Sequence, residues 1–332
     1  MERQPDFNNI LKVLRREAPD RPTLFEFYLN LPLYEKLVGR KYVGTSKADS
    51  ENFIIQAFRC AGYDYATVSG SAFILNTRQA KHLNTRSLNE GGAVPDREAF
   101  DAYEWPSPDD FDYSYLDDLQ VPDGMKLMVS GPCGVLENAV DMAGYENLCV
   151  KIYDDPQFVE DLFDKIGSSI LRHYEKAMQH KHVGLIMSND DWGFNTQTML
   201  SVKHMREYVF PWHKKIVELA HSAGLPVVLH SCGYANEIMD DIIDDIGYDG
   251  KHSFEDSIMT IEDSYRKWGG RIALLGGIDL NFLIHKSPAE IRARSAAMLE
   301  LGQKGFALGT GNSVPEFVPD ESYFAMTSAA LS

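Results

Sequence analysis

Two residues that bind soft divalent metals stand two positions apart at the end of an apolar run. The run Pro226-Val227-Val228-Leu229 leads into His230, Ser231, Cys232 and Gly233. In an extended strand, residues two apart point to the same face, so the imidazole and the thiol would converge on one ion such as zinc. A core histidine beside a buried cysteine has the same spacing, and both interpretations stay open on this motif alone.

Other apolar runs also end in polar side chains. The residues at these ends are Asn189, Asp190, Asp191, His252, Glu255, Asp279, Thr310 and Asn312. Asp190 and Asp191 suit either helix N-caps or hydrogen bonds to a substrate. Glu26 lies inside a further apolar run, where a charge costs several kcal/mol unless it is paired, so it needs a structural or a functional partner.

These side chains require elements that bring strand ends together. Eight apolar runs, each followed by a helical pattern, predict a single-domain α/β fold, a (β/α)8 TIM barrel spanning residues 1–332. The runs are Thr23–Tyr28, Tyr65–Ser69, Lys126–Ser130, Gly184–Asp190, Pro226–Cys232, Gly250–Glu255, Ile272–Gly277 and Gly305–Gly309. A loop-rich, aromatic insertion over residues 76–123 interrupts the alternation and suits a lid, a substrate wall or a packed excursion.

Local signals place several helices between these strands. Asp155-Pro156 and the capping box of Ser287 with Glu290 each predict a helix start. A pattern of apolar residues from Val202 to Ala223 predicts a helix that Pro211 kinks or splits. The histidines on helical patterns, among them His173 and His213, are expected to be structural or surface residues.

Composition narrows the functional class. The chain has 332 residues, 44% of them hydrophobic, and 32 basic against 49 acidic residues give a net charge of −17, which argues against nucleic-acid binding. No apolar segment reaches a membrane-spanning length, and four cysteines without paired spacing favour a reducing compartment, so a cytoplasmic protein is expected. Gly309-x-Gly311 lacks the lysine and the helix of a phosphate loop, which argues against a nucleotide site.

Four motifs together resemble the uroporphyrinogen decarboxylase superfamily, and most closely its branch of corrinoid-dependent methyltransferases. They are Ser188–Gly193, His230–Gly233, Gly276–Asp279 and Gly309–Pro315. The resemblance implies a (β/α)8 barrel and a catalytic zinc held by the His-x-Cys pair and a later cysteine. The distantly similar cobalamin-independent methionine synthases add a glutamate a little over twenty residues later, and Glu255 stands near that place.

The chain departs from this pattern in two places. Thr310 stands where the methyltransferases carry the later cysteine. One fewer thiolate would make a bound zinc a stronger Lewis acid and would suit an oxygen ligand. The arginine-rich motif with which the decarboxylase binds substrate carboxylates has no counterpart around Thr23–Tyr28, where Glu26 would repel them.

The resemblance and the residues lead to one expected function. We expect zinc bound by His230, Cys232 and Glu255, and methyl transfer between a small methylated substrate, such as an O-methyl ether, and a corrinoid (cobalamin) carried by a partner protein. Expected to orient the substrate or supply a proton are Glu26, Asp190 and His252. Expected to contact the substrate are Phe25, Asn189, Trp192, Asp279 and Asn312. A homo-oligomer, a tetrapyrrole-processing enzyme without metal, and a non-catalytic barrel that binds a corrinoid or small ligand stay open as alternatives.

Overall fold

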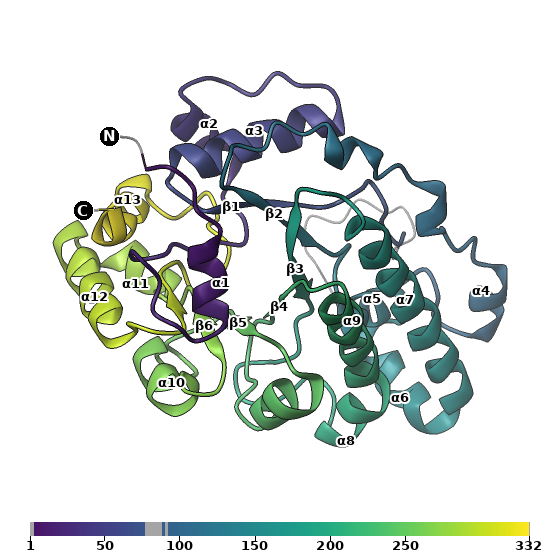
Figure 1. Cartoon of the computed structure of the whole chain (residues 1–332). Coiled ribbons are helices and arrows are strands. Elements are labelled where there is room, and N and C mark those ends of the chain that lie inside the picture. The colour runs from purple at the N-terminus through teal and green to yellow at the C-terminus, as the bar shows by residue number, and fades with distance from the viewer. Residues whose placement is uncertain (1–2, 77–87, 90–91, 332) are drawn as a thin grey trace.

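The core of the protein is a parallel β-sheet whose strands follow one another in chain order. The computed structural model describes residues 3–76, 88–89 and 92–331. Within them, seven strands pair in the order β1-β2-β3-β4-β5-β6-β7, every pair parallel. The sheet curls, and helices surround its outer face (Figure 1). This α/β architecture agrees with seven of the eight predicted strand–helix units.

The strands are short and almost wholly buried, as expected for parallel strands covered on both faces. Their bounds are β1 Tyr65–Val68, β2 Lys126–Ser130, β3 Val183–Asn189, β4 Val227–His230, β5 Gly250–His252, β6 Ala273–Leu275 and β7 Phe306–Ala307.

The first predicted strand, Thr23–Tyr28, is the one that departs from expectation. It pairs with the residue after β7 through a single parallel bridge, Leu24 to Leu308. Toward β1, the Tyr65 hydroxyl bonds both the N–H and the carbonyl oxygen of Glu26, at 2.7 and 2.6 Å. A side chain therefore occupies the place where backbone pairing would complete a ring of eight strands.

The helices begin where the sequence places their caps. Asp155 Oδ1 accepts a hydrogen bond from Phe158 N–H at the start of α7, and Ser287 with Glu290 forms the capping box of α12. The predicted Pro211 break is confirmed, because the helix over 202–222 is divided by a wider turn, η3 Met205–Val209.

The helices are α1 Asn8–Leu14, α2 Leu31–Val38, α3 Lys47–Cys60, α4 Arg97–Ala102, α5 Val135–Ala143, α6 Tyr145–Asp154, α7 Pro156–Ala177, α8 Val202–His204, α9 Phe210–Ser222, α10 Ile261–Trp268, α11 Leu280–His285, α12 Pro288–Leu301 and α13 Asp320–Leu331, with shorter turns η1 Pro108–Asp110, η2 Ser114–Asp117 and η4 Asp241–Ile246.

The predicted insertion is loop-rich where the structure describes it. Between residues 92 and 123 it contains α4, η1 and η2 joined by irregular chain. Residues 77–87 and 90–91 of the insertion lie outside the described part.

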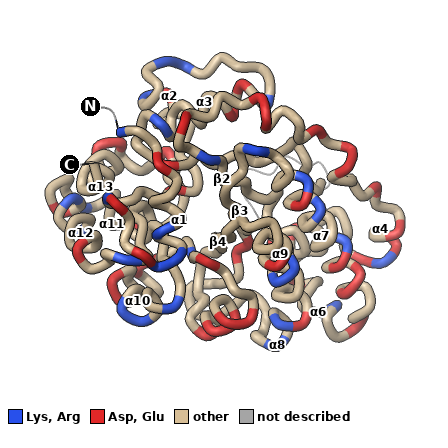
Figure 2. The backbone as a smooth tube through the Cα atoms, in the orientation of Figure 1, with Lys and Arg blue, Asp and Glu red and all other residues tan. Residues whose placement is uncertain are grey.

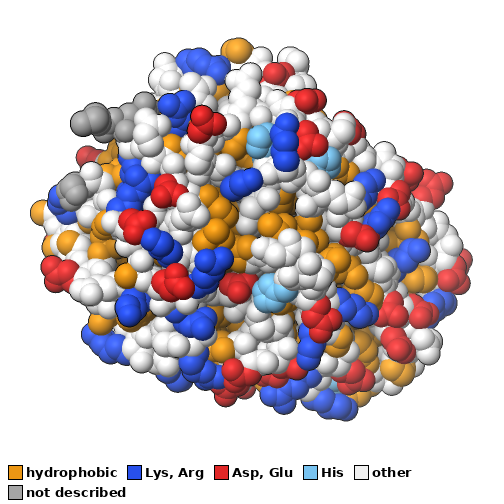
Figure 3. Space-filling view, viewed as in Figure 1, with side chains coloured by type: hydrophobic (Ala, Val, Ile, Leu, Met, Phe, Trp, Pro, Cys, Tyr) orange, Lys and Arg blue, Asp and Glu red, His pale blue; other side chains and the backbone are white. Residues whose placement is uncertain are grey.

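Helix α1 covers the amino ends of the strands. Phe7 packs beside Gly184 at the start of β3, and Leu14 packs beside Gly250 at the start of β5. Figure 1 shows α1 in front of the strands, and Figure 3 shows the same face with charged side chains of both signs around apolar ones. The carboxyl ends of the strands, where the predicted site residues lie, face the opposite side.

Charge is spread over the whole molecule. Figure 2 shows acidic and basic residues interspersed along the outer helices. Among the described helices, none combines the length and the apolar character needed to cross a membrane.

Candidate metal centre

Three metal-type side chains meet at the carboxyl ends of β3 and β4. Asp191, His230 and Cys232 each offer one ligand atom, and these atoms lie within 4.8 Å of one another. His230 Nε2 is 3.6 Å from Cys232 Sγ. Imidazole nitrogen, cysteine sulfur and carboxylate oxygen are the atoms with which proteins bind zinc, and catalytic sites use three protein ligands.

Two glycines allow the β3 and β4 loops to approach closely enough to form this group. Gly233 has φ +78, in the left-handed region, and a Cβ there would collide with the backbone of Gly193. The contact places Asp191 beside Cys232, whose N–H donates to Asp191 Oδ1 at 2.8 Å.

A chain of hydrogen bonds fixes which nitrogen of His230 carries the proton. His252 Nε2 lies 3.1 Å from the Thr310 carbonyl oxygen, which can only accept, so this nitrogen is protonated. Burial holds the pKa of His252 well below its usual value, so the ring is neutral and its Nδ1 accepts. His230 Nδ1, at 2.8 Å, must then donate to it, which leaves an unprotonated Nε2 facing Cys232.

The loop after β7 also contacts the cysteine of this group. Asn312 Nδ2 donates to Cys232 Sγ at 3.1 Å, a contact that favours a thiolate. The same loop thus acts on His230 through the Thr310 carbonyl, which bonds His252, and acts on Cys232 directly through the Asn312 amide.

Glu26 holds this loop through hydrogen bonds to Thr310, and it does so as a neutral carboxyl group. Its Oε1 accepts from the Thr310 N–H at 2.7 Å, and its Oε2 lies 2.7 Å from the Thr310 hydroxyl. That hydroxyl has one proton but also faces the Asn312 carbonyl oxygen. Both contacts are hydrogen bonds only if Glu26 carries a proton and donates it. Burial agrees, because it raises the pKa of Glu26 to about 8.

His230 is buried, Asp191 and Cys232 are partly exposed, and one cation lies nearby. Burial, and then the Lys251 charge, lowers the pKa of His230 to about 3. Burial, and then the Asp191 carboxylate, raises the pKa of Cys232. The Lys251 ammonium is buried and donates to the carbonyl oxygens of Ser231 and Ser253, at 3.3 and 2.7 Å. Burial lowers its pKa to about 8, opposed by the charges of Cys232, Glu255 and Asp191.

Glu255, the predicted third ligand, has a different neighbour. Its Oε1 accepts a hydrogen bond from Gly233 N–H at 3.1 Å, so it holds the turn after Cys232. Asp191 completes the group of three in its place.

Asp190 points away from this centre. Its oxygens accept from the N–H groups of Leu136 and Glu137, both at 2.9 Å, and so cap α5 from the neighbouring unit. Gly134, just before α5, permits this approach, because a Cβ there would collide with the carboxylate. His213 Nε2 bonds the same carboxylate at 2.9 Å, and its Nδ1 lies 2.6 Å from the Tyr248 hydroxyl. The alternative that Asp190 is a helix cap is thus realised, on a helix that precedes it.

The residues predicted to contact substrate lie in several environments. Phe25 is buried against His252, with ring centroids 5.4 Å apart, and Trp192 is buried against Phe210 and His213. Asn189 Oδ1 accepts from Gly131 N–H at 3.1 Å. Asp279 caps α11 through Phe282 N–H. Of the five, Asn312 is the one whose side chain bonds a residue of the metal-type group.

From the sequence, Asp191 was expected to cap a helix or bond a substrate, and Lys251 was not singled out. Asp191 lies beside His230 and Cys232 because two loops pack glycine on glycine, and the nearest signal was the pair Gly193 and Gly233. Lys251 and His252 are consecutive residues of β5. A lysine inside a predicted strand was the signal for a buried charge that needs partners.

Comparisons with known proteins agree with this architecture. The family model described as Uroporphyrinogen decarboxylase (URO-D) matches residues 127–332, more than half of the chain. A search of curated proteins found no match.

Among solved structures, a methyltransferase from Methanosarcina mazei aligns with a TM-score of 0.68 at 17% identity, over 97% of each chain, which shows a shared fold. A Listeria monocytogenes protein named for vitamin-B12-independent methionine synthase aligns over 99% of this chain and 97% of its own at 12% identity. Its TM-score of 0.49 is too low to carry an argument.

Proposed function

This chain belongs to the uroporphyrinogen decarboxylase family, and we propose that within it the protein is a zinc-dependent methyltransferase. It would move a methyl group between a small methylated substrate and a corrinoid carried by a partner protein. The observation that carries the proposal is the group Asp191, His230 and Cys232, in which His230 presents an unprotonated nitrogen. The fold likeness to a methyltransferase is consistent with it.

The donor set suits zinc. Three protein ligands of mixed N, S and O type are the catalytic arrangement, which leaves a position for substrate. We assign the third ligand to Asp191 in place of Glu255, because Glu255 is bonded to Gly233 and lies outside the group. Zinc held there would act as a Lewis acid on the heteroatom that bears the methyl group.

The surrounding residues would keep the ligands in place. His252 fixes the tautomer and the ring orientation of His230, and Asn312 orients the sulfur of Cys232. Glu26 retains a proton on Oε2 and holds the Thr310 loop on which both contacts depend. We therefore propose Glu26 and His252 as positioning residues, because their contacts are to the ligands and the loop. Lys251 would offset part of the negative charge of the ligands.

A cavity at the same end of the sheet suits a small substrate. It has a volume of about 590 Å³ and is lined by Tyr28, Ser69, Phe73, Ser130 and Asn138, among others. Small-molecule pockets are typically ~300–1,000 Å³ and combine apolar walls with a few polar groups. The Phe27 ring connects this cavity with the metal-type group. Its centroid lies 4.4 Å from that of Tyr28, which lines the cavity, and 4.7 Å from that of His230.

The acidic residues around the centre disfavour the decarboxylase alternative. Asp191, Glu255 and the neutral Glu26 offer no cations for a substrate with several carboxylates, and the buried Lys251 is occupied by two carbonyl oxygens. A corrinoid partner rests on the sequence resemblance, so the test must address it directly.

The test is a methyl-transfer assay with the zinc-loaded enzyme and a reduced corrinoid protein. Candidate methyl donors, with O-methyl ethers first, are added while the visible spectrum of the corrinoid is followed. We expect methylation that depends on zinc and is lost in Cys232→Ala, whereas His285→Ala, an exposed histidine on α11, serves as the matched control. Decarboxylation of a tetrapyrrole by the metal-free enzyme would overturn the proposal.

A further inference from the structure

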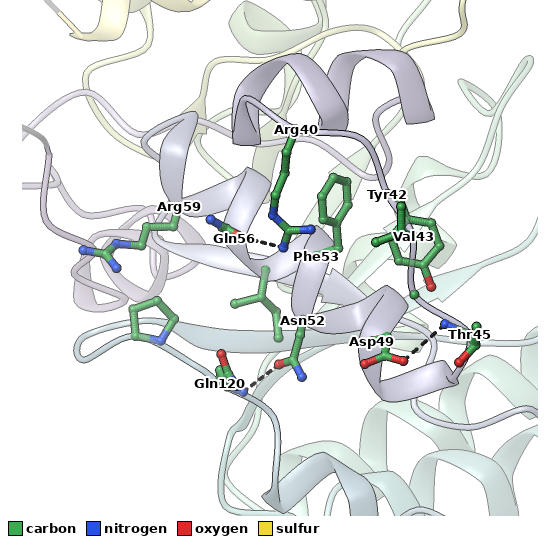
Figure 4. A pocket seen from close by; sticks show the side chains of 13 residues that line it. Arg40, Tyr42, Val43, Thr45, Asp49, Asn52, Phe53, Gln56, Arg59 and Gln120 are labelled. Atoms are coloured by element: carbon green, nitrogen blue, oxygen red, sulfur yellow. Dashed lines mark hydrogen bonds between the residues drawn. The ribbon is translucent and has the colours of Figure 1, made fainter.

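A polar cavity of about 630 Å³ lies on the outer side of α3, away from the metal centre. It is bounded by the loop over residues 40–45, the outer face of α3 and the segment before β2, which contributes Gln120 and Pro122 (Figure 4). We propose that this cavity binds a small organic or inorganic oxyanion, a phosphate or carboxylate group. The inference is independent of the methyltransferase proposal.

The charge inside the cavity is opposite to that of the chain. Arg40 and Arg59 line it, with Asp49 as the acidic lining residue. Asp49 Oδ2 already accepts hydrogen bonds from the backbone N–H groups of Thr45 and Ser46, at 3.2 and 3.1 Å. Its carboxylate therefore bonds the backbone of the turn that begins α3. With two guanidinium groups and one carboxylate, the lining of the cavity has a net positive charge.

Arg59 lacks the acidic partners that several other arginines have within the described part of the chain. Arg172, Arg271 and Arg294 each form ion pairs with two acidic side chains. Within residues 3–76, 88–89 and 92–331, no ion pair to Arg59 is present, although the sequence has 49 acidic residues against 32 basic ones. A partly buried guanidinium without a carboxylate leaves its donors available to a ligand.

The amide side chains of the cavity also present donors. Asn52 Oδ1 accepts from the Gln120 N–H at 2.7 Å, and Gln56 Oε1 accepts from Arg40 Nη2 at 3.3 Å. Because these oxygens are occupied, the NH₂ groups of Asn52 and Gln56 remain for a ligand. Figure 4 shows Gln56 between Arg59 and Arg40 on one side of α3.

The position of Arg40 is fixed by more than its hydrogen bond. Its guanidinium lies over the Phe53 ring, 5.0 Å from the centroid. A stacked guanidinium keeps its edge oriented, which reduces the entropy lost when it binds the planar or tetrahedral oxygens of an anion. The cavity thus combines two cations, of which Arg40 is oriented by its neighbours, with neutral donors, a pattern that favours oxyanions over cations.

The test is isothermal titration calorimetry of the intact 332-residue chain at low chloride with inorganic phosphate and, separately, with citrate. We expect saturable binding of at least one probe and about tenfold or greater weakening in Arg59→Gln and in Arg40→Gln. Arg266→Gln, an exposed arginine on α10, should bind as the unchanged protein does. The two probes distinguish a phosphate site from a carboxylate site.

Three outcomes would overturn the inference. They are absence of saturation up to about 10 mM probe, equal weakening in Arg266→Gln, and binding that survives both cavity variants. The titrations are repeated in Cys232→Ala, and binding that disappears there would place the anion at the metal centre instead. Loss of methyl transfer in that variant leaves the oxyanion result unaffected, so the two proposals fail separately.

Discussion

Two histidine-centred clusters lie side by side at the carboxyl ends of β3 to β5, and they differ in how their polar atoms are used. Around His213, both ring nitrogens and both Asp190 oxygens have partners within the protein. Around His230, the unprotonated Nε2 atom faces the Cys232 sulfur at 3.6 Å, and an Asp191 carboxylate oxygen lies within 4.8 Å of both ligand atoms. The consecutive residues Asp190 and Asp191 are divided between the two clusters.

The difference separates a structural network from a candidate reactive one. Burial and a histidine–carboxylate contact are common to both clusters, so neither feature identifies function. The distinguishing property is the convergence of three metal-type atoms of different residues around His230, whereas His213 has one carboxylate beside it. The following experiments test that distinction.

Removal of a metal-type ligand should have the largest effect. We expect His230→Ala or Cys232→Ala to lose zinc and methyl transfer completely, beyond the ~10- to 100-fold typical of a positioning partner. The fold should persist, because both residues lie at the outer end of β4. Metal analysis and circular dichroism measure the two properties. A collapsed fold with His285→Ala intact would indicate a core role instead.

Asp190→Ala should lower the stability of the fold and leave zinc binding unchanged. The change uncovers two buried N–H groups of α5 and leaves His213 without its acceptor, so the free energy of unfolding should fall by about 3–5 kcal/mol. Denaturant titration measures this. Asp279→Ala, which also removes a helix cap, should cost about 1 kcal/mol. Zinc loss at unchanged stability would assign Asp190 to the metal centre.

A third buried histidine should make stability depend on pH. His173 bonds the Tyr113 hydroxyl at 2.9 Å and the Ser130 carbonyl oxygen at 3.3 Å, and burial lowers its pKa to about 4. The unfolded chain takes up this proton near pH 6.5, so stability should fall by about 3 kcal/mol as the pH decreases from ~6.5 to ~4.

His173→Gln isolates this contribution from the titration of carboxyl groups. Unfolding free energies of both proteins are measured at several pH values, and their difference should shrink toward low pH. A constant difference between the two proteins would contradict the buried, neutral state of His173.

The smallest effect should come from the residue that orients the sulfur. Asn312→Leu removes the 3.1 Å contact to Cys232 Sγ at similar volume, so zinc affinity should fall about tenfold with little change in unfolding. Competition with a chromophoric chelator measures the affinity. Asn281→Leu, on the exposed side of α11, is the control, and equal affinity in both variants would remove Asn312 from the metal centre.

The sequence predicted much of the fold because strand and helix signals are local. Seven strands, the caps at Asp155 and Ser287, and the Pro211 break follow from short-range patterns. The first strand was less predictable, since its partner on the β1 side is the Tyr65 hydroxyl, which no pattern in Thr23–Tyr28 reveals. His230 and Cys232 were found because their spacing is local too. The closeness of Asp191 to His230 and Cys232 could not be predicted, because the contact between Gly193 and Gly233 that produces it joins separate loops.

The capping of α5 by Asp190 also bears on the order in which the molecule can assemble. Gly134 has no side chain that could cap α5. The first amides of the helix are instead bonded by a carboxylate 54 residues later in the chain. Helix α5 therefore gains its full stability only after β3 has docked, and the two should open and close as one cooperative unit. Amide hydrogen exchange at Leu136 and Glu137 would then match the slow exchange of the central strands, although helix ends elsewhere fray.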